Sequence, residues 1–117
     1  AVAIAGRMSL RRRLQEHASE LGIDVWLTPS TTSDAPEGLA STGSPLMNLP
    51  WTYAGVPTVS VPAGKSGKGL PLGLQLAGNY MEDERLVAMT ETLFGEKDVA
   101  QDVSEPKTKA KRKKSAA

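Results

Sequence analysis

The middle of the chain reads Val56-Pro-Thr-Val-Ser-Val-Pro62, then Ala63-Gly-Lys-Ser-Gly-Lys-Gly69, then Leu70-Pro-Leu-Gly-Leu-Gln-Leu-Ala77. The two outer segments place apolar residues between small or neutral ones and carry no charge, a pattern that predicts β-strands. The segment between them is polar and rich in glycine, which predicts a flexible turn. We therefore expect a hairpin, or an arrangement close to one, at the centre of the fold.

A helix is predicted upstream of this hairpin, from Ile4 to Leu21. Apolar residues recur there at the three-and-four spacing of a single helix stripe, which comprises Leu10, Leu14, Ala18 and Leu21. Gly22 supplies a stop. The next residues, Ile23 to Leu27, predict a short strand closed by Thr28 and Pro29.

A second helix is expected downstream, from Glu82 to Phe94, with Gly95 ending it. Glu82, Asp83 and Glu84 stand in its first turn, where the helix dipole favours anions. We interpret this acidic group as helix-start electrostatics rather than as a metal or acid–base site. The buried face should consist of the residues at helical spacing, namely Leu86, Val87, Thr90, Leu93 and Phe94.

A long loop separates the first strand from the hairpin. Residues Ser30 to Ser44 are Ser, Thr, Asp, Pro and Gly with little to bury, and long loops in compact proteins are often functional. Pro45 to Ala54 predicts a short helix or a broken turn, because Pro50 is compatible only with a first helical turn.

The predicted helices are too few to cover both faces of the predicted sheet. The chain has 117 residues, which is one domain or a piece of one. Uncharged, leucine-rich strands suit the middle of a sheet that is covered on both faces. Three strands and two good helices supply too little cover, so we expect a larger partner, with partial disorder or self-association in its absence.

Composition excludes several classes of protein. The chain has no cysteine, so it has no disulfide, thiolate zinc site or cysteine nucleophile. A single histidine cannot build a multi-histidine metal centre, and we expect neither metal nor cofactor. No apolar run approaches the roughly 18 residues of a membrane span. The apolar opening has no basic segment before it, which argues against a secretory signal and for a cytoplasmic protein.

Three features that suggest chemistry have simpler readings. Lys65-Ser66 follows Gly64, but a phosphate loop requires a glycine where Val59 stands and a helix where a strand follows. Ser60 lacks the flanking glycines of a nucleophile elbow. His17 is interpreted as a half-buried packing residue on the helix stripe rather than as a catalytic base.

Charge is distributed unevenly along the chain. The totals are 14 basic against 13 acidic residues, yet six basic residues and one acid lie after Ser104. We expect a disordered basic tail over residues 97–117, which could bind nucleic acid or an acidic partner weakly. A non-catalytic binding or scaffold module that acts through this tail is the alternative function. Because the chain begins with Ala1 rather than Met, we expect it to begin within a longer protein.

Four segments occur in an order that points to a family. They are Asp24-Val-Trp-Leu-Thr-Pro29, Asn48-Leu-Pro-Trp-Thr-Tyr-Ala-Gly55, Val56-Pro-Thr-Val-Ser-Val-Pro-Ala-Gly64 and Gly69-Leu-Pro-Leu-Gly-Leu-Gln-Leu-Ala-Gly78. Together with the acid-led helix that follows, they resemble the C-terminal end of the amidase signature family. The resemblance covers residues 1–95.

The resemblance implies an α/β fold, a fragment of the α/β/α sandwich with a mixed central sheet. About three strands and two to three helices would be present, with residues 1–96 as the C-terminal part of the amidase domain. It implies a hydrolase of carbon–nitrogen amide bonds whose Ser–cis-Ser–Lys triad lies in an earlier part of the family chain. No catalytic residue is therefore expected here. The chain should be inactive without the missing N-terminal part or another subunit.

Several residues of these four segments also have a structural interpretation of their own. Gly73 inside a strand indicates close approach by another backbone. Gln75 stands alone among leucines, so its amide must find partners, for which we expect backbone groups of a neighbouring segment. Asn48 should do a similar job before the short helix, bonding to the chain that it faces.

The resemblance places the wall of a substrate pocket in the loop before Asn48. Our candidate pocket residues for a small-molecule amide are the polar or aromatic residues that flank this loop, namely Ser41, Thr42, Trp51 and Tyr53. The tRNA-amidotransferase branch of the family places an aspartate seven residues before the asparagine, where this chain has Ser41. That departure favours a small-amide or generic amidase.

Overall fold

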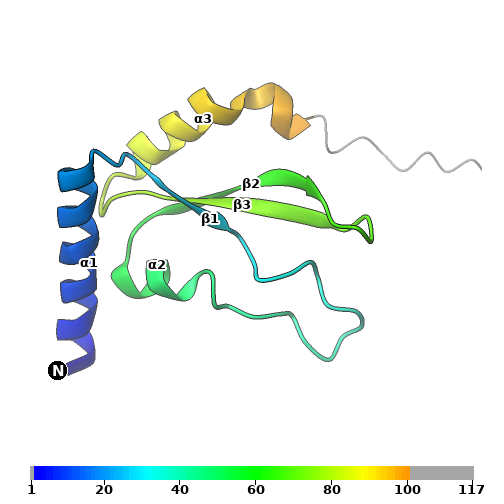
Figure 1. Cartoon of the computed structure of the whole chain (residues 1–117), viewed down its shortest axis with the longest axis horizontal. Coiled ribbons are helices and arrows are strands. Elements are labelled where there is room, and N and C mark those ends of the chain that lie inside the picture. Colours follow the sequence, from blue (N-terminus) through cyan, green and yellow to red (C-terminus); the bar gives the residue numbers. More distant parts are fainter. Residues whose placement is uncertain (1, 101–117) are drawn as a thin grey trace, which may run out of the picture.

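The computed structural model describes residues 2–100 of the chain. Six elements follow one another along it (Figure 1): α1 (Val2–Leu21), β1 (Trp26–Pro29), α2 (Leu49–Ala54), β2 (Thr58–Lys65), β3 (Pro71–Ala77) and α3 (Asp83–Ala100). The fold is mixed α/β, as expected for a piece of the amidase sandwich. Most of the expected basic tail, residues 97–117, lies outside the described residues and stays a prediction.

The three strands form one antiparallel sheet in the order β1-β3-β2. β2 and β3 are joined by a short turn, which confirms the predicted hairpin, with a register shift between Pro62 and Lys65. β1 pairs with the other edge of β3, from Trp26 opposite Ala77 to Pro29 opposite Leu74. The strand begins later than predicted because Ile23 N donates to Ala18 O at 2.8 Å and thus belongs to the end of α1. Pro29 is accommodated because β1 is an edge strand.

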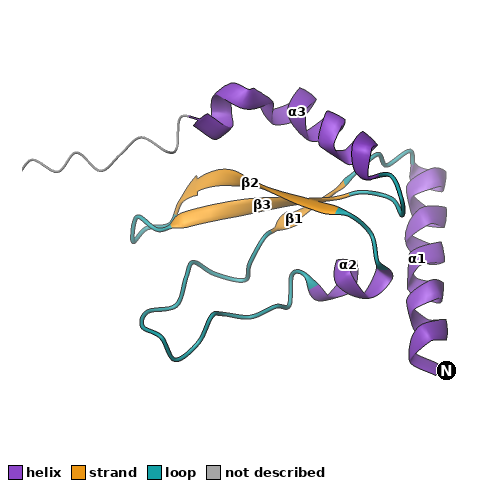
Figure 2. Ribbon diagram, turned by 180° about the vertical axis from the view of Figure 1, so that it is seen from behind, coloured by secondary structure: helices purple, strands orange, loops and turns teal. Residues whose placement is uncertain are grey.

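The two faces of the sheet differ in chemistry. Leu74, Leu76, Val59 and Val61 share one face, since the register aligns Leu76 with Val59 and Leu74 with Val61. Figure 2 shows α3 over this face, and α2 with the long loop beyond the opposite face. Val61, Leu76 and Leu86 of α3 form the buried core cluster. The apolar face is therefore covered by one helix.

α3 covers the sheet with a narrower stripe than its sequence indicated. Leu86 and Thr90 are buried and Phe94 packs partly against the core, as expected. The prediction was wrong for Val87 and Leu93, which are both exposed. The reason is geometric, because residues 86, 90 and 94 follow one line along a helix and residues 87 and 93 lie to either side of it. The helix breaks at Gly95, whose φ of 62° and ψ of 162° are not helical.

α1 packs through most of its predicted apolar stripe and through polar contacts as well. Of that stripe Ala18 is buried and Leu10 and Leu14 are partly buried, whereas Leu21 is exposed. His17 is also exposed, so its interpretation as a half-buried packing residue was wrong. It comes directly before Ala18 and lies beside the stripe, where no element of residues 2–100 buries it.

The contacts of α1 go to the short helix α2. Arg7 Nε donates to Tyr53 O at 2.9 Å, and Arg11 Nε donates to Ala54 O at 2.7 Å. These are carbonyls of the last turn of α2, which a helix leaves without partners of its own. Pro50 stands in the first turn of this helix, as the sequence required, and Gly55 ends it with a φ of 72°. In residues 2–100 no helix is both long and apolar enough to cross a bilayer.

Candidate functional site

The sheet face that α3 does not cover carries a line of polar residues. Thr28 of β1 and Ser60 of β2 both lie opposite Gln75 of β3 in the register of the sheet. We call these three residues the polar row. It crosses all three strands on the face away from α3, and Figure 1 shows α2 and the long loop on that side of the sheet. Strand alternation places Ser60 and Gln75 on the face opposite the valines and leucines that neighbour them in their strands.

Gln75 is the anchor of the polar row and is only 3% exposed. Its Nε2 donates to Asn48 Oδ1 at 2.8 Å, and Thr28 Oγ1 donates to Gln75 Oε1 at 3.3 Å. The expectation that Gln75 bonds to backbone groups was wrong, because its partners are side chains and the neighbouring strands use the backbone groups that face β3 in the sheet. The expectation for Asn48 is confirmed, since it bonds across to the sheet that it faces.

Ser30 extends the polar row just after the end of β1. We call the polar row together with Ser30 and Asn48 the polar surface. Its Oγ donates to Ser60 Oγ at 3.0 Å, and its backbone N donates to Gly73 O at 3.0 Å. A Cβ at position 73 would lie 2.6 Å from Ser30 Oγ. A close approach at Gly73 was predicted, and the approaching group is a side chain rather than a backbone. Gly73 is thus the residue that makes room for the Ser30–Ser60 pair.

A cavity of about 230 Å³ lies between the long loop and the sheet. Its walls are the two arms of the loop and the residues of β3 beneath them, namely Ser30, Thr31, Thr32, Ser33, Asp34, Ala35, Pro36, Thr42, Gly43, Ser44, Pro71 and Gly73. Ser30 and Gly73 therefore belong both to the cavity and to the polar surface. We call this space the loop cavity.

The four candidate pocket residues do not all gather at the loop cavity. Thr42 lines it. Ser41 shapes it, because Ser41 Oγ accepts a hydrogen bond from Gly43 N at 3.1 Å. Trp51 and Tyr53 lie on α2 and are not among its walls. Contact of these residues with a substrate stays a prediction.

Trp51 and Tyr53 have different surroundings on α2. Tyr53 Oη donates to Ala3 O at 2.8 Å and so faces α1. Trp51 is 8% exposed, and its Nε1 has no hydrogen-bond partner among the described residues. A buried indole N–H normally finds an acceptor. The indole ring of Trp51 is therefore positioned by its packing among the described residues, and its backbone carbonyl accepts from Gly55 N and Val56 N.

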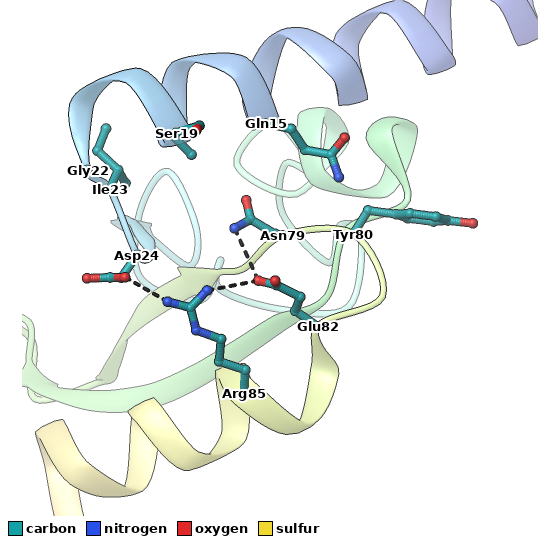
Figure 3. Close-up of a pocket in the computed structure, with 10 residues that line it drawn as sticks. Gln15, Ser19, Gly22, Ile23, Asp24, Asn79, Tyr80, Glu82 and Arg85 are labelled. Carbon is teal, nitrogen blue, oxygen red and sulfur yellow. Dashed lines mark hydrogen bonds and ion pairs between the residues drawn. The ribbon is translucent and has the colours of Figure 1, made fainter.

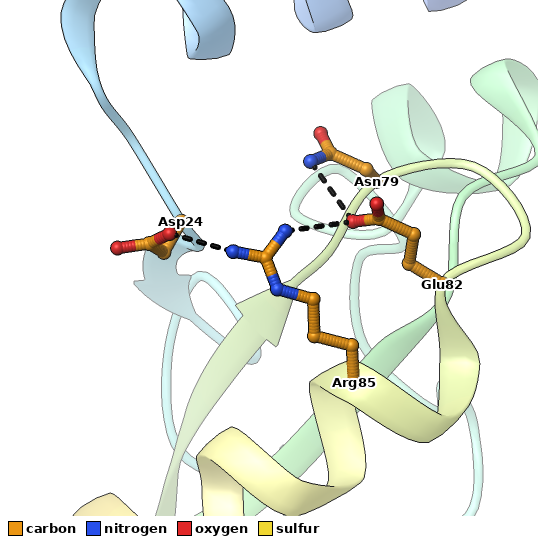
Figure 4. Close-up of polar contacts among 4 residues, drawn as sticks. All are labelled: Asp24, Asn79, Glu82 and Arg85. Carbon is orange, nitrogen blue, oxygen red and sulfur yellow. Dashed lines mark hydrogen bonds and ion pairs between the residues drawn. The ribbon is translucent and has the colours of Figure 1, made fainter.

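A second cavity, of about 420 Å³, lies between the end of α1 and the start of α3 (Figure 3). Arg85 bridges its floor, with Nη2 at 2.8 Å from Asp24 Oδ1 and Nη1 at 3.3 Å from Glu82 Oε2. Asn79 Nδ2 also donates to Glu82 Oε2, at 3.1 Å (Figure 4). Because these charges are at least 42% exposed, the pairs contribute little to stability each. They tie the start of α3 to the segment before β1.

The chemistry of the polar surface is that of binding. It offers amide and hydroxyl groups, and within the described residues none of these hydroxyls bonds to a lysine or histidine. In the same part of the chain no three His, Asp or Glu side chains gather closely enough to hold a metal ion. These amide and hydroxyl groups could hold a polar group of a ligand against the sheet by hydrogen bonds.

The family follows from a match over most of the chain. The family model described as Amidase matches residues 2–87, which include both cavities and the polar row. The chain belongs to the amidase family. The resemblance drawn from the four sequence segments is thereby confirmed, and the mixed α/β architecture agrees with it.

Curated relatives of this amidase-family chain are A subunits of glutamyl-tRNA(Gln) amidotransferase. The one from Beijerinckia indica is 40% identical over 91 residues, 70% of this chain and 18% of the relative. The subunit from Parvibaculum lavamentivorans is 41% identical over 81 residues, which are 62% of this chain and 16% of the relative. The subunit from Rhodospirillum rubrum is 44% identical over 73 residues, which are 56% of this chain and 14% of the relative. The chain thus spans less than a fifth of each relative.

These relatives bear on the interpretation of Ser41. The serine at this position favoured a branch other than the tRNA amidotransferases, yet the relatives above carry that name. Identities of 40% or more over the matched segments make the chain similar to this branch in spite of Ser41. A single position does not outweigh the similarity of the whole segment.

Proposed function

We propose that this chain forms part of the central sheet and of the substrate-pocket wall of an enzyme that hydrolyses carbon–nitrogen amide bonds. The Ser–Ser–Lys centre would be supplied by a part of the enzyme outside this sequence, or by another subunit. Membership of the amidase family supports the reaction class. The proposal involves no metal and no cofactor, and a cytoplasmic location stays part of the proposal.

One observation carries the assignment to a pocket wall. Gln75, Asn48 and Thr28 form a hydrogen-bonded chain on the face of the sheet opposite α3, whereas the face under α3 is leucine and valine. A buried amide is costly unless its bonds are made, so such a chain holds its members in a defined orientation. It supports a surface against which a polar substrate is positioned, next to the loop cavity.

The division of labour follows from the family chemistry. A serine attacks the amide carbonyl, the lysine accepts the serine's proton through the middle serine, and that proton passes to the nitrogen as the C–N bond breaks and the amine leaves. Water then releases the acyl group. The residues of this chain would position the amide and exclude water from the polar face, which is how a wall contributes to rate.

We propose an amide as the substrate and do not assign a particular amide. The relatives are named for glutamyl-tRNA(Gln) amidotransferase, in which they are A subunits. Ser41 lacks the carboxylate that the resemblance places at this position in that branch. We therefore propose amide hydrolysis by a complete enzyme of this family, with further subunits as its partners.

A chimera tests the proposal. Residues 2–95 of this chain would replace the matching segment of the Beijerinckia indica subunit, and ammonia release from glutamine and from propionamide would be measured. We expect turnover of at least one amide by the chimera and none by the chain of residues 1–117. In the chimera, Gln75→Met should lower kcat/KM at least tenfold, whereas Glu91→Gln on the exposed side of α3 should not change it.

Two outcomes would contradict the proposal. One is a folded chimera that hydrolyses neither amide. The other is turnover by the isolated chain that a single substitution within it abolishes, because the chain would then contain its own catalytic centre.

A further inference from the structure

Helix α2 is too short to be stable on its own. It has six residues, from Leu49 to Ala54, whereas isolated helices shorter than about 12–15 residues are marginal in water. Figure 1 shows α2 beside α1, on the face of the sheet opposite α3. The place of α2 is therefore decided by the contacts that its two ends make with these neighbours.

The first end of α2 is tied to the sheet through Asn48. An asparagine at the N-cap position usually accepts a hydrogen bond from a backbone N–H of the first helical turn, which stabilises the helix. Asn48 stands at this position, but its side chain makes no such bond among the described residues. Its Oδ1 accepts instead from Gln75 Nε2, at 2.8 Å. A residue suited to stabilise α2 thus serves the polar surface, and α2 needs support elsewhere.

The last turn of α2 receives that support from two arginines of α1. Arg7 and Arg11 are four residues apart and so lie on the same face of α1. Their Nε atoms donate to Tyr53 O and Ala54 O, at 2.9 and 2.7 Å. Hydrogen bonds from a charged donor are stronger than neutral ones, and a cation is favoured at a helix C-terminus. α1 therefore holds the last turn of α2.

Arg11 is itself held in one position. Its guanidinium carbon lies 3.6 Å from the centroid of the Tyr80 ring, and a Cβ at Gly55 would lie 2.9 Å from its Nη2. The guanidinium thus contacts the Tyr80 ring and the end of α2 together, and Gly55 makes room for it. Because Arg11 is fixed from both sides, it can fix α2 in turn.

The two ends of α2 are close enough to be coupled. Six residues of α-helix rise about 9 Å, which is less than two turns. Between the ends Trp51 is buried, and Ala54 is completely buried. A helix of this length moves as one body, so a shift of its last turn also shifts its first. Asn48, which is the partner of the Gln75 amide, is therefore placed by α1 as well as by the sheet.

We propose that Arg7 and Arg11 are positioning residues of the polar surface: by holding the last turn of α2, they fix Asn48 and through it the orientation of the Gln75 amide. Neither arginine belongs to the polar surface or lines the loop cavity. Since the polar surface is proposed as a pocket wall, this role rests on the proposed function and assigns to the reaction two residues remote from the wall.

The position of α2 can be measured through Trp51. The chain contains two tryptophans, so Trp26→Phe leaves Trp51 as the one tryptophan that fluoresces. Acrylamide quenching is then recorded for the full chain at low concentration. We expect Arg11→Ala to raise the quenching constant at least twofold, because α2 is released and the buried indole becomes accessible. Asn48→Ala should do the same from the other end, whereas Arg11→Lys, which keeps a cationic donor for Ala54 O, should restore at least half of the protection.

Two controls separate positioning from a general loss of stability. Arg12→Ala removes the neighbouring arginine, whose ion pair is with the exposed Glu16, and should leave the quenching constant unchanged. Val61→Ala truncates a buried side chain of the core under α3, on the other face of the sheet. It should lower the urea midpoint of unfolding but leave Trp51 as protected as in the parent.

Three results would overturn the proposal. One is equal quenching in the parent and the Arg11→Ala chain. Another is a Val61→Ala chain in which quenching rises as much as in Arg11→Ala, because protection of Trp51 would then report stability alone. Should Arg11→Ala lose its folded spectrum, unchanged quenching in Asn48→Ala is the third.

The effect on the wall is measured in the chimera with the Beijerinckia indica subunit. Arg11→Ala should lower kcat/KM for the hydrolysed amide at least fivefold, and Arg12→Ala should not change it. In a Gln75→Met chimera, the further loss from Arg11→Ala should be less than twofold, because the amide that Arg11 positions is gone. Equal losses in the two backgrounds would contradict positioning through Gln75. A chimera without turnover would refute the proposed amidase function, and the quenching constants would then decide alone whether the arginines place α2.

Discussion

Gln75 shows how one amide organises the polar face of the sheet. It is nearly fully buried, it accepts from Thr28, and it donates to Asn48, which lies 27 positions away in the sequence. Removing a member of such a network leaves the others desolvated and unpaired, which costs more than the bond itself contributes. Gln75 is therefore a determinant of stability as well as of pocket shape.

The substitution Gln75→Met tests this at the scale of one residue. Methionine keeps the volume but makes neither hydrogen bond, so the free energy of unfolding should fall by about 1–3 kcal/mol. Urea unfolding of the full chain measures the change. Glu91→Gln, an exposed position on α3, serves as the control and should leave the midpoint unchanged. If Gln75→Met unfolds at the same urea concentration as the parent, the hydrogen bonds of Gln75 to Thr28 and Asn48 contribute nothing to stability.

Arginine side chains are among the contacts that attach helix α1 to the rest of the molecule. Arg11 bonds to the last carbonyl of α2, and its guanidinium also lies 3.6 Å from the centroid of the Tyr80 ring. A cation at a helix C-terminus is favoured by the helix dipole, and the ring adds a cation–π contact. One side chain thus joins α1, α2 and the segment before α3.

At the scale of elements, we predict that Arg11→Ala releases α1. The free energy of unfolding should fall by about 1–3 kcal/mol, since a charged hydrogen bond and a cation–π contact are lost together. Faster amide hydrogen exchange in α1, with the sheet unchanged, would locate the effect. Arg12→Ala is the matched control, because Arg12 is 72% exposed and its ion pair is with the exposed Glu16, at 3.7 Å. Equal effects of the two substitutions would contradict the role given to Arg11.

The whole molecule has a thin core for its size. Leu76 is the one large side chain in the described part of the chain that is below 2% exposed. All three helices show large apolar side chains at the surface, among them Met8 of α1, Leu49 of α2 and Leu93 of α3. Exposed apolar area of this kind marks surfaces that other protein covers. The relatives, of which this chain spans 14–18%, are long enough to supply that cover.

At this scale we predict that the isolated chain self-associates and melts over a broad temperature range. Sedimentation at several protein concentrations and calorimetry measure the two properties. The chimera with the Beijerinckia indica subunit should instead melt cooperatively, because its remaining segments cover the apolar helix faces. A concentration-independent monomer with a sharp transition would contradict this prediction.

Local patterns in the sequence were sufficient for the elements and for the family. Alternation in the two strands around Lys65 predicted the hairpin, and helical spacing with a following glycine predicted α1 and α3. These features depend on backbone preferences and on side-chain periodicity, which neighbouring residues determine. The order of the Asn48, Gly73 and Gln75 motifs indicated the amidase family for the same reason, because it is a property of spacing.

The partners of those residues depended on the tertiary structure. The Thr28–Gln75 bond joins residues 47 positions apart, and the arginine contacts of α1 reach α2 across a similar separation. The exposure of Val87 and the partial burial of Asp34 likewise depend on which element packs against them. Periodicity states that a residue faces one side of its own element, but contact requires another element on that side. Only the packing of the whole chain decides where that element lies.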